Sequence, residues 1–351
     1  MIFYILLLLG AFVLVFISYK QPCLEKQVSF SLLGIMMVVG GFRDHIGWDY
    51  NAYVHWYLYG TRDQDFEFGF LALLQFFRYF KIDYRFLFFF FSFFTYLFAY
   101  LGIREYTKKT SLPLLLYLVI PVFFLYSFTY VRQFLAVTIA FYAFSFLLKK
   151  QYWSYFLLMF LGISVHKSCL IPLVFFLLIY KWGECINQYY IVLLMGLSFV
   201  ISKIGLIYLL SLLLKDSHYL FYVSSQFAVP VPWTKLIGLN AMGLIVLIWY
   251  HMYGFQVAHQ KILVMLYLFS VIIINLFSES TELTRVYIYF RIFEIIIVAE
   301  IIRNSLKRKH LYLITFLSCF YIVPFFRAIK IDSEYGPEKL KLIPYKSYLV
   351  G

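Results

Sequence analysis

The sequence predicts an all-α, polytopic integral membrane protein with about ten spanning helices. Of its 351 residues, 64% are hydrophobic and 13% are charged, whereas soluble domains carry roughly 25% charged residues. Long apolar stretches separate the charge clusters, as hydrocarbon requires of helices that satisfy their own backbone hydrogen bonds. The four cysteines are scattered without CxxC spacing, which argues against a metal or disulfide framework. We also expect no cofactor.

Ten apolar segments have the length that a membrane-spanning helix needs. They are residues 2–18, 27–42, 86–103, 112–128, 133–148, 189–214, 236–253, 262–278, 287–302 and 311–326. Two further apolar regions consist of shorter pieces, residues 68–80 and the pair 152–164 and 168–180. We expect these pieces to be re-entrant or half-spanning segments. No internal repeat or low-complexity linker is evident, so we expect a single polytopic membrane domain over residues 1–351.

Basic residues concentrate in short loops, which marks the cytoplasmic side of a membrane protein. These residues are Arg104, Lys108, Lys109, Lys149, Lys150, Lys181, Lys261, Lys307, Arg308 and Lys309. One orientation places all of them in the cytoplasm and both termini outside. The loops 43–67 and 215–235 and the C-terminal tail 327–351 then face outward. Much of the net charge of +13 lies in short loops, so it predicts no nucleic-acid partner.

The loop after the second predicted span reads GFRDHIGWDYNAY and combines charged residues with flat rings. We expect Asp49 to act as a base on a sugar hydroxyl. Trp48, Tyr50 and Tyr53 are expected to stack on sugar rings. Arg43 is expected to bind substrate. The alternative is an interfacial loop with aromatic membrane anchors and solvated ion pairs.

Arg132 and His166 are the other candidate catalytic residues. Arg132, in YVRQFLA, begins an otherwise apolar helix at its predicted outer end, where the guanidinium and the helix N-terminus favour a diphosphate. The alternative is an arginine that reaches up to the lipid headgroups. His166 and Lys167 interrupt an apolar run, and we expect His166 to move a proton or donate to phosphate and Lys167 to bind substrate. The alternative is a capping turn whose charge reaches water.

A late segment, ELTRVYIYFRIFEIIIVAE, supplies two further arginines. Arg285 lies at the outer end without an obvious helical partner, and we expect it to bind phosphate. Arg291 is also a candidate for substrate binding. Glu294 follows it by three residues and shares its helix face, so the two are also expected to neutralise each other.

Several short motifs occur in one order along the chain. They read GFRDHIGWDYNAY, EFGF at residues 67–70, YVRQFLA, VHKSCLI and, near the C-terminus, IPYKS. This ordered set covers most of the chain and resembles the EpsG-like branch of the Wzy-type polysaccharide polymerases. The chain departs from the family pattern at Phe68, where the family often has proline.

The resemblance implies a GT-C-like membrane glycosyltransferase architecture. It also implies an enzyme that joins undecaprenyl-diphosphate-linked oligosaccharide repeat units on the outer face of the bacterial inner membrane, for O-antigen, capsule or exopolysaccharide. The matching motifs add Glu67, Gln133 and Tyr345 to the expected substrate-binding residues. Membrane lipid, a chain-length regulator and a flippase are the expected partners, with no nucleic acid.

Two other functions suit a polytopic membrane protein. An O-antigen ligase would pass the same glycan to a lipid A core, and a large, basic, histidine-rich outer loop late in the chain would favour it. The loop 215–235 is instead short and mostly apolar. A flippase or transporter without chemistry would favour charges at the midplane and repeated halves. The charges here concentrate toward one face, which favours a reaction at the membrane surface.

Overall fold

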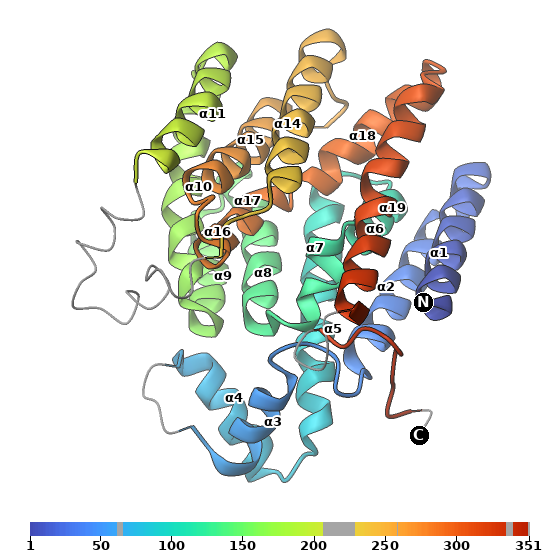
Figure 1. Ribbon diagram of the computed structural model, residues 1–351, viewed down its shortest axis with the longest axis vertical. Helices are drawn as coiled ribbons and strands as arrows, with labels where there is room; N and C mark the ends of the chain where they lie inside the picture. The colour runs from blue at the N-terminus through green and yellow to red at the C-terminus, as the bar shows by residue number, and fades with distance from the viewer. Residues whose placement is uncertain (62–65, 206–228, 258, 335–339, 350–351) are drawn as a thin grey trace. The chain divides into compact units, whose positions relative to one another are not determined.

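The computed structural model describes residues 1–61, 66–205, 229–257, 259–334 and 340–349. Within these ranges every regular element is a helix (Figure 1), which confirms the predicted all-α class. The chain divides into two compact units. Unit 1 consists of residues 1–170 and 298–351, and unit 2 consists of residues 171–297. The single membrane domain stays a prediction.

Unit 1 contains most of the long helices. They are α1 (Ile2–Lys20), α2 (Glu25–Gly41), α3 (Tyr50–Tyr59), α4 (Phe68–Tyr79), α5 (Tyr84–Tyr106), α6 (Ser111–Val119), α7 (Pro121–Phe124), α8 (Val131–Leu148), α9 (Tyr152–Val165) and α19 (Leu311–Glu334), with the 3-10 turns η1 (Pro22–Leu24), η2 (Tyr126–Phe128) and η3 (Lys167–Cys169). Two helices cross the boundary between the units, α10 (Leu170–Trp182) and α18 (Glu294–Lys307). Unit 2 contains α11 (Gln188–Lys203), α14 (Trp233–Tyr253), α15 (Gln260–Leu276), α16 (Thr281–Thr284), η4 (Arg285–Tyr287) and α17 (Ile288–Arg291).

Six helices of the described chain are long and apolar enough to cross a membrane, and the count of about ten spans is not confirmed. The six are Ile2–Lys20, Pro22–Gly41, Tyr84–Tyr106, Val131–Leu148, Trp233–Tyr253 and Leu311–Asp332. A seventh span would require α6 and the segment Pro121–Phe128 to cross together despite a bend of 80° between them. The predicted spans agree best with the observed helices where a long apolar run contains no helix-breaking residue.

The remaining predicted spans are shorter or broken in the structure. Residues 112–128 break at Pro121, because proline cannot donate the helical hydrogen bond and its ring clashes with the preceding turn. Residues 287–302 are divided among η4, α17 and α18. The helix predicted over 189–214 ends at Lys203, and residues 206–214 lie outside the described part of the chain. Residues 262–278 form the 17-residue helix α15.

The three pieces expected to be too short to span are indeed short helices. They are α4 with 12 residues, α9 with 14 and α10 with 13. At 1.5 Å per residue, such helices reach roughly 20 Å, whereas the hydrocarbon core is about 30 Å thick. Their re-entrant course through a membrane stays a prediction.

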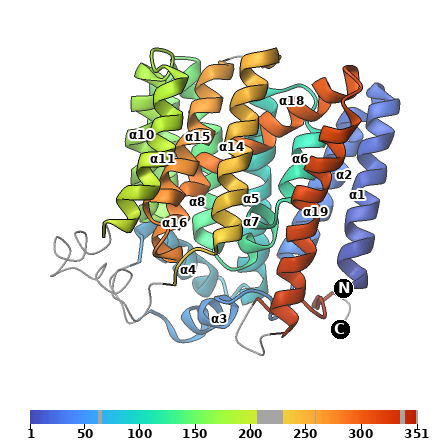
Figure 2. The ribbon, with the colours of Figure 1, turned by 45° about the horizontal axis from the view of Figure 1, so that its top comes forward.

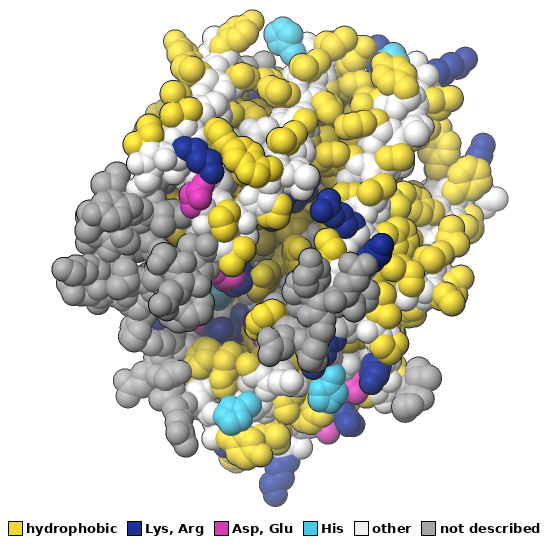
Figure 3. All heavy atoms as spheres, in the orientation of Figure 1, with side chains coloured by type: hydrophobic (Ala, Val, Ile, Leu, Met, Phe, Trp, Pro, Cys, Tyr) yellow, Lys and Arg dark blue, Asp and Glu magenta, His cyan; other side chains and the backbone are white. Residues whose placement is uncertain are grey.

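Helix α8 forms the centre of unit 1, where it packs against α5 and α9. The buried share of the apolar stretch is 78% in α8 but only 22% in α1. α1 therefore exposes apolar side chains, among them Leu6 and Phe16, and hydrophobic side chains cover the α1 and α19 region in Figure 3. α19 returns beside α1 (Figure 2), with the Tyr4 and Phe325 rings 6.2 Å apart.

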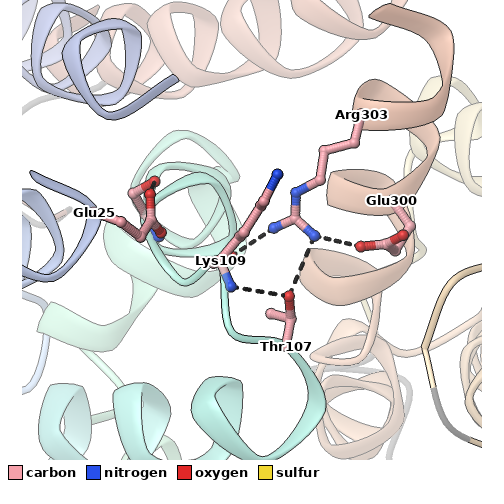
Figure 4. Close-up of polar contacts among 6 residues, drawn as sticks. Glu25, Thr107, Lys109, Glu300 and Arg303 are labelled. Carbon is pink, nitrogen blue, oxygen red and sulfur yellow. Dashed lines mark hydrogen bonds and ion pairs between the residues drawn. The ribbon is translucent and has the colours of Figure 1, made fainter. Parts of the chain in front are cut away.

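The two ends of unit 1 carry different residues. At one end, where α5 and α8 finish, Glu105 pairs with Lys149. At the same end Arg303 pairs with Glu300 and donates to the hydroxyl of Thr107, at 3.3 Å, and to a backbone carbonyl of the loop before α6 (Figure 4). The opposite end contains the start of α8 and the N-terminus (Figure 1). Basic loops and predicted site residues are therefore separated within this unit, and which end faces the cytoplasm stays a prediction.

Candidate active site

Three segments that are distant in the sequence meet at the carboxylate of Glu67. Its Oε2 accepts a hydrogen bond from Nη1 of Arg132 at 2.5 Å, and its Oε1 accepts one from the backbone N–H of Lys167 at 2.9 Å. Nδ1 of His166 lies 3.3 Å from the same Oε1. This is an ion-pair distance, although the ring nitrogen makes no aligned hydrogen bond within the described chain. The side chain of Glu67 is 7% exposed, so the carboxylate is almost enclosed by these partners.

Local backbone geometry explains why the three segments meet. Glu67 is the extended residue that precedes α4, and Gly69 in the first turn of that helix rests against the end of α9. A Cβ on Gly69 would lie 2.6 Å from the hydroxyl oxygen and 2.7 Å from the carbonyl oxygen of Ser164. His166 is extended and ends α9. The N–H of Lys167 begins the next turn, where backbone donors have no partner inside the helix, and it is used by Glu67.

Arg132 is held by rings as well as by the carboxylate. Its Nε donates to the hydroxyl oxygen of Tyr53 at 3.1 Å. Its guanidinium carbon lies 4.6 Å from the ring centre of Phe70, 4.9 Å from that of Phe66 and 5.8 Å from that of Trp56. These are distances at which a cation is attracted to an aromatic face. The side chain is 17% exposed, so one part of the guanidinium remains accessible.

The protonation of Glu67 follows from these neighbours. Burial alone would raise the pKa of its carboxyl group. The His166 ring, the charge of Arg132 and the N–H of Lys167 outweigh burial and lower the pKa to about 2. An effective general base has a pKa near the working pH, so Glu67 is ionised near neutral pH and is a poor base. A negative charge at this position suits a residue that orients Arg132 and His166.

Asp49 and Tyr53 reach this cluster from α3. Asp49 precedes the helix, is partly exposed, and interacts electrostatically with both Tyr53 and Arg132. Tyr53 is buried and makes the hydrogen bond to Arg132 described above. Gln133 is the next residue of α8 and is also buried. The structure thus brings together most of the predicted residues of unit 1.

Other predicted residues of the loop before α3 lie in different surroundings. Trp48 is 61% exposed, as a ring that stacks on a sugar would need to be. Tyr50 is buried, stacks on Phe88 with ring centres 4.3 Å apart, and donates to Asp44 at 3.2 Å. Stacking of Tyr50 on a sugar stays a prediction, and its observed partner is a phenylalanine.

Arg43 and Tyr345 make contacts that stabilise the protein itself. Arg43 is 1% exposed, and its guanidinium donates to the carbonyl oxygens of Gly40, Ile46 and Phe128. Tyr345 donates to the carbonyl oxygen of Val39 at 2.9 Å. These bonds give both residues a structural role, and their contact with substrate stays a prediction.

The two late arginines belong to unit 2, and both are paired. Nε of Arg291 lies 2.7 Å from Oε2 of Glu294, which confirms that these neighbours neutralise each other. Arg285 forms an ion pair with Glu282. The expectation that Arg285 lacks a helical partner was therefore wrong. Glu282 lies three residues earlier, in the short helix α16, and Arg285 begins the 3-10 turn η4 that follows.

The sequence reasoning gave no role to the three rings around Arg132. Phe70 is the last residue of the motif EFGF and Phe66 directly precedes the motif, so this motif was the available signal. Trp56 lies one helical turn from Tyr53 on α3, and periodicity could have placed it on the same face. In the described ranges, no three His, Cys, Asp or Glu side chains come together as metal ligands would. Absence of a metal in the reaction stays a prediction.

Comparison with known families matches residues 26–347 to the EpsG family. Neither the curated proteins nor the solved structures compared with the chain contain a match. The matched range covers nearly the full chain and includes Glu67, Arg132 and His166. The chain therefore belongs to the EpsG family, a family of Wzy-like polysaccharide polymerases.

Proposed function

We propose that this chain joins undecaprenyl-diphosphate-linked oligosaccharide repeat units on the outer face of the bacterial inner membrane. The polymer would be an O-antigen, a capsule or an exopolysaccharide. The observation that carries this proposal is the meeting of Arg132, His166 and the Lys167 N–H around Glu67. An arginine oriented in this way is suited to a diphosphate, because the guanidinium fork matches phosphate geometry.

The proposed reaction needs no cofactor. The hydroxyl oxygen of an acceptor sugar forms a bond to the anomeric carbon of the donor glycan. The bond between that carbon and the diphosphate oxygen breaks, and undecaprenyl diphosphate leaves with the bonding electron pair. The hydroxyl proton passes to a base. Positioning of the two substrates and stabilisation of the negative leaving group are the main tasks of the protein.

Arg132 is the proposed ligand of the leaving diphosphate. Nε and Nη1 are held by Tyr53 and Glu67, while Nη2 has no hydrogen-bond partner among the described residues. The positive end of the α8 dipole favours an anion at the same position. A guanidinium that is already fixed by two partners loses little conformational freedom when it binds phosphate.

The remaining roles follow from burial and charge. Glu67 is a positioning residue, because its low pKa makes it a poor base and its partners surround it. His166 is 27% exposed and is the proposed second donor to the diphosphate. Lys167 is exposed beside it and adds positive charge. Asp49 is the proposed base for the acceptor hydroxyl, since it is a carboxylate close enough to act on Arg132 and is itself partly exposed.

Gel display of the surface glycan tests this function in cells. A strain that lacks the gene should show a single-repeat band, and the wild-type gene should restore a ladder of long chains. Arg132→Ala should leave the single-repeat band. Arg78→Ala, at an exposed arginine of α4, should restore the ladder and serves as the matched control.

Two results would contradict the proposal. An unmodified core with full-length carrier-linked chains in the deletion strain would identify a ligase. Lipid-linked single units that remain in the cytoplasm would identify a flippase. A ladder restored by Arg132→Ala would keep the family assignment but remove Arg132 from the site.

A further inference from the structure

The C-terminal segment 340–348 lies along the loop 42–48 that leads into α3. Arg43 and Ser347 form an antiparallel β-bridge. On one side of the bridge the N–H of Asp44 donates to the carbonyl oxygen of Lys346 at 2.9 Å, and on the other the N–H of Tyr348 donates to that of Phe42 at 3.2 Å. The segment thus adds backbone hydrogen bonds to a loop that has no regular structure of its own.

Further contacts attach both ends of this segment to unit 1. The N–H of Gly47 donates to the carbonyl oxygen of Leu340 at 2.7 Å. The N–H of Leu342 donates to Oδ2 of Asp332 on α19 at 2.7 Å. The ring of Tyr345 stacks on Phe3 of α1, with ring centres 4.0 Å apart. The segment is therefore tied to the loop, to α19 and to α1.

The same loop has little freedom to move toward its other neighbours. Gly47 has a φ of +109°, and a Cβ there would lie 2.1 Å from the carbonyl oxygen of Phe128. The N–H of Trp48 donates to the hydroxyl of Thr129 at 3.1 Å. The loop is consequently enclosed between the C-terminal segment on one side and the turn before α8 on the other.

We propose that segment 340–348 is a positioning element for chain extension. It holds loop 42–48 so that Asp49, which follows directly, and Tyr53, in the first turn of α3, stay beside Arg132. This inference rests on the proposed function. The physical basis is geometric, because displacement of the catalytic base by about 1 Å from the acceptor hydroxyl can lower the reaction rate about a hundredfold. The contacts of Arg132 with Glu67 and the surrounding rings would remain.

Tyr348→Pro is the most selective test, because proline lacks the N–H that bonds to Phe42. Leu349→Pro is the matched control. The N–H of Leu349 bonds only to the hydroxyl of Ser347, two residues earlier, among the described residues. Tyr348→Phe keeps the N–H and the ring and removes the hydroxyl. A chain ending at residue 339 serves as the stronger variant, since it removes every contact of the segment.

Three measurements on the purified variants separate positioning from folding. Hydrogen exchange of peptides over residues 42–48 should become about tenfold faster in Tyr348→Pro and remain unchanged in Leu349→Pro. The number of binding sites for undecaprenyl diphosphate per protein, and their affinity, should stay those of the wild type. Chain extension per binding site should fall about 10- to 100-fold. Tyr348→Phe should retain most activity.

Each contrary result has a distinct meaning. Unchanged exchange of residues 42–48 in Tyr348→Pro and in the shortened chain would show that the segment does not hold the loop. Faster exchange with normal turnover per site would refute the positioning role. A loss of binding sites in proportion to activity would assign the segment to folding. Wild-type protein that extends no chains would instead overturn the proposed function, and the positioning role with it.

Discussion

Replacement of Glu67 by glutamine isolates the role of its negative charge. Glutamine has nearly the same shape and keeps one oxygen as an acceptor, but it loses the charge that Arg132 and His166 face at 2.5 Å and 3.3 Å. Its amide N–H₂ group would also point a donor toward at least one of these donors. We therefore expect Arg132 to leave its observed orientation in Glu67→Gln.

The magnitude follows from the electrostatics of the site. A decrease of the Glu67 pKa from 4.5 to about 2 corresponds to roughly 3 kcal/mol in favour of the charged form. Arg132 and His166 are 17% and 27% exposed, so water screens part of this interaction. About 2 kcal/mol remains, which corresponds to about a 30-fold fall in kcat/KM if the oriented guanidinium is needed in the transition state.

The lowered pKa of Glu67 also predicts how the stability of the folded protein depends on pH. A carboxyl group whose pKa is lowered in the folded protein contributes stability above its ordinary pKa, and this contribution is lost as the pH falls through the lowered value. Wild-type protein should therefore lose stability between about pH 4.5 and pH 2 through this site. Glu67→Gln should be less stable than wild type at pH 7 and should approach it near pH 2.

Chain extension by purified protein and thermal unfolding in detergent measure both effects. Glu105→Gln is the control, because it removes a carboxylate that pairs with Lys149 at the other end of unit 1. An exposed pair of that kind is worth about 0–1 kcal/mol. Normal kcat/KM in Glu67→Gln, or equal effects of the two substitutions, would refute the positioning role of Glu67.

Two further predictions concern packing and topology. Gly69→Ala should reduce activity at least as much as Glu67→Gln, because its Cβ would lie within 2.7 Å of Ser164 and force α4 away from α9. Gly34→Ala, where a Cβ meets nothing within 4 Å, should be active, and equal activity of the two alanine variants would contradict the close packing. In a cysteine-free background, a cysteine at Asp49 should react with an impermeant reagent from outside, and one at Lys108 only after permeabilisation. Labelling of the Asp49 position from the cytoplasm alone would reverse the proposed orientation.

The sequence predicted helices well where hydropathy alone determines them. The run 2–18 became Ile2–Lys20 and the run 86–103 became Tyr84–Tyr106, because a helix lets a single apolar segment in hydrocarbon satisfy all its own backbone hydrogen bonds. The predicted spans differ from the observed helices where a local feature overrides hydropathy. Pro121 breaks one predicted span, and the segment around Arg291 is divided into short helices.

The candidate site was predicted as separate pieces and not as one cluster. Glu67 and Arg132 are 65 residues apart, and the Lys167 N–H comes from 100 residues beyond Glu67. A single sequence contains no information about such distant contacts, so Glu67 could be named only from the EFGF motif. Arg43 shows the opposite case, since its loop suggested an exposed ligand and its guanidinium is buried among backbone carbonyls.

Replacement of Arg132 by lysine tests the central claim most directly, in a purified assay with lipid-linked repeat units. Lysine keeps the charge but cannot donate simultaneously to Tyr53, Glu67 and a diphosphate in the arrangement that the guanidinium fork allows. We predict that Arg132→Lys inserts and accumulates normally and loses about 10- to 100-fold in kcat/KM. Arg78→Lys should match the wild type. Near-normal chain extension by Arg132→Lys would contradict the account, because a residue that serves only as a membrane anchor is replaced by lysine without loss.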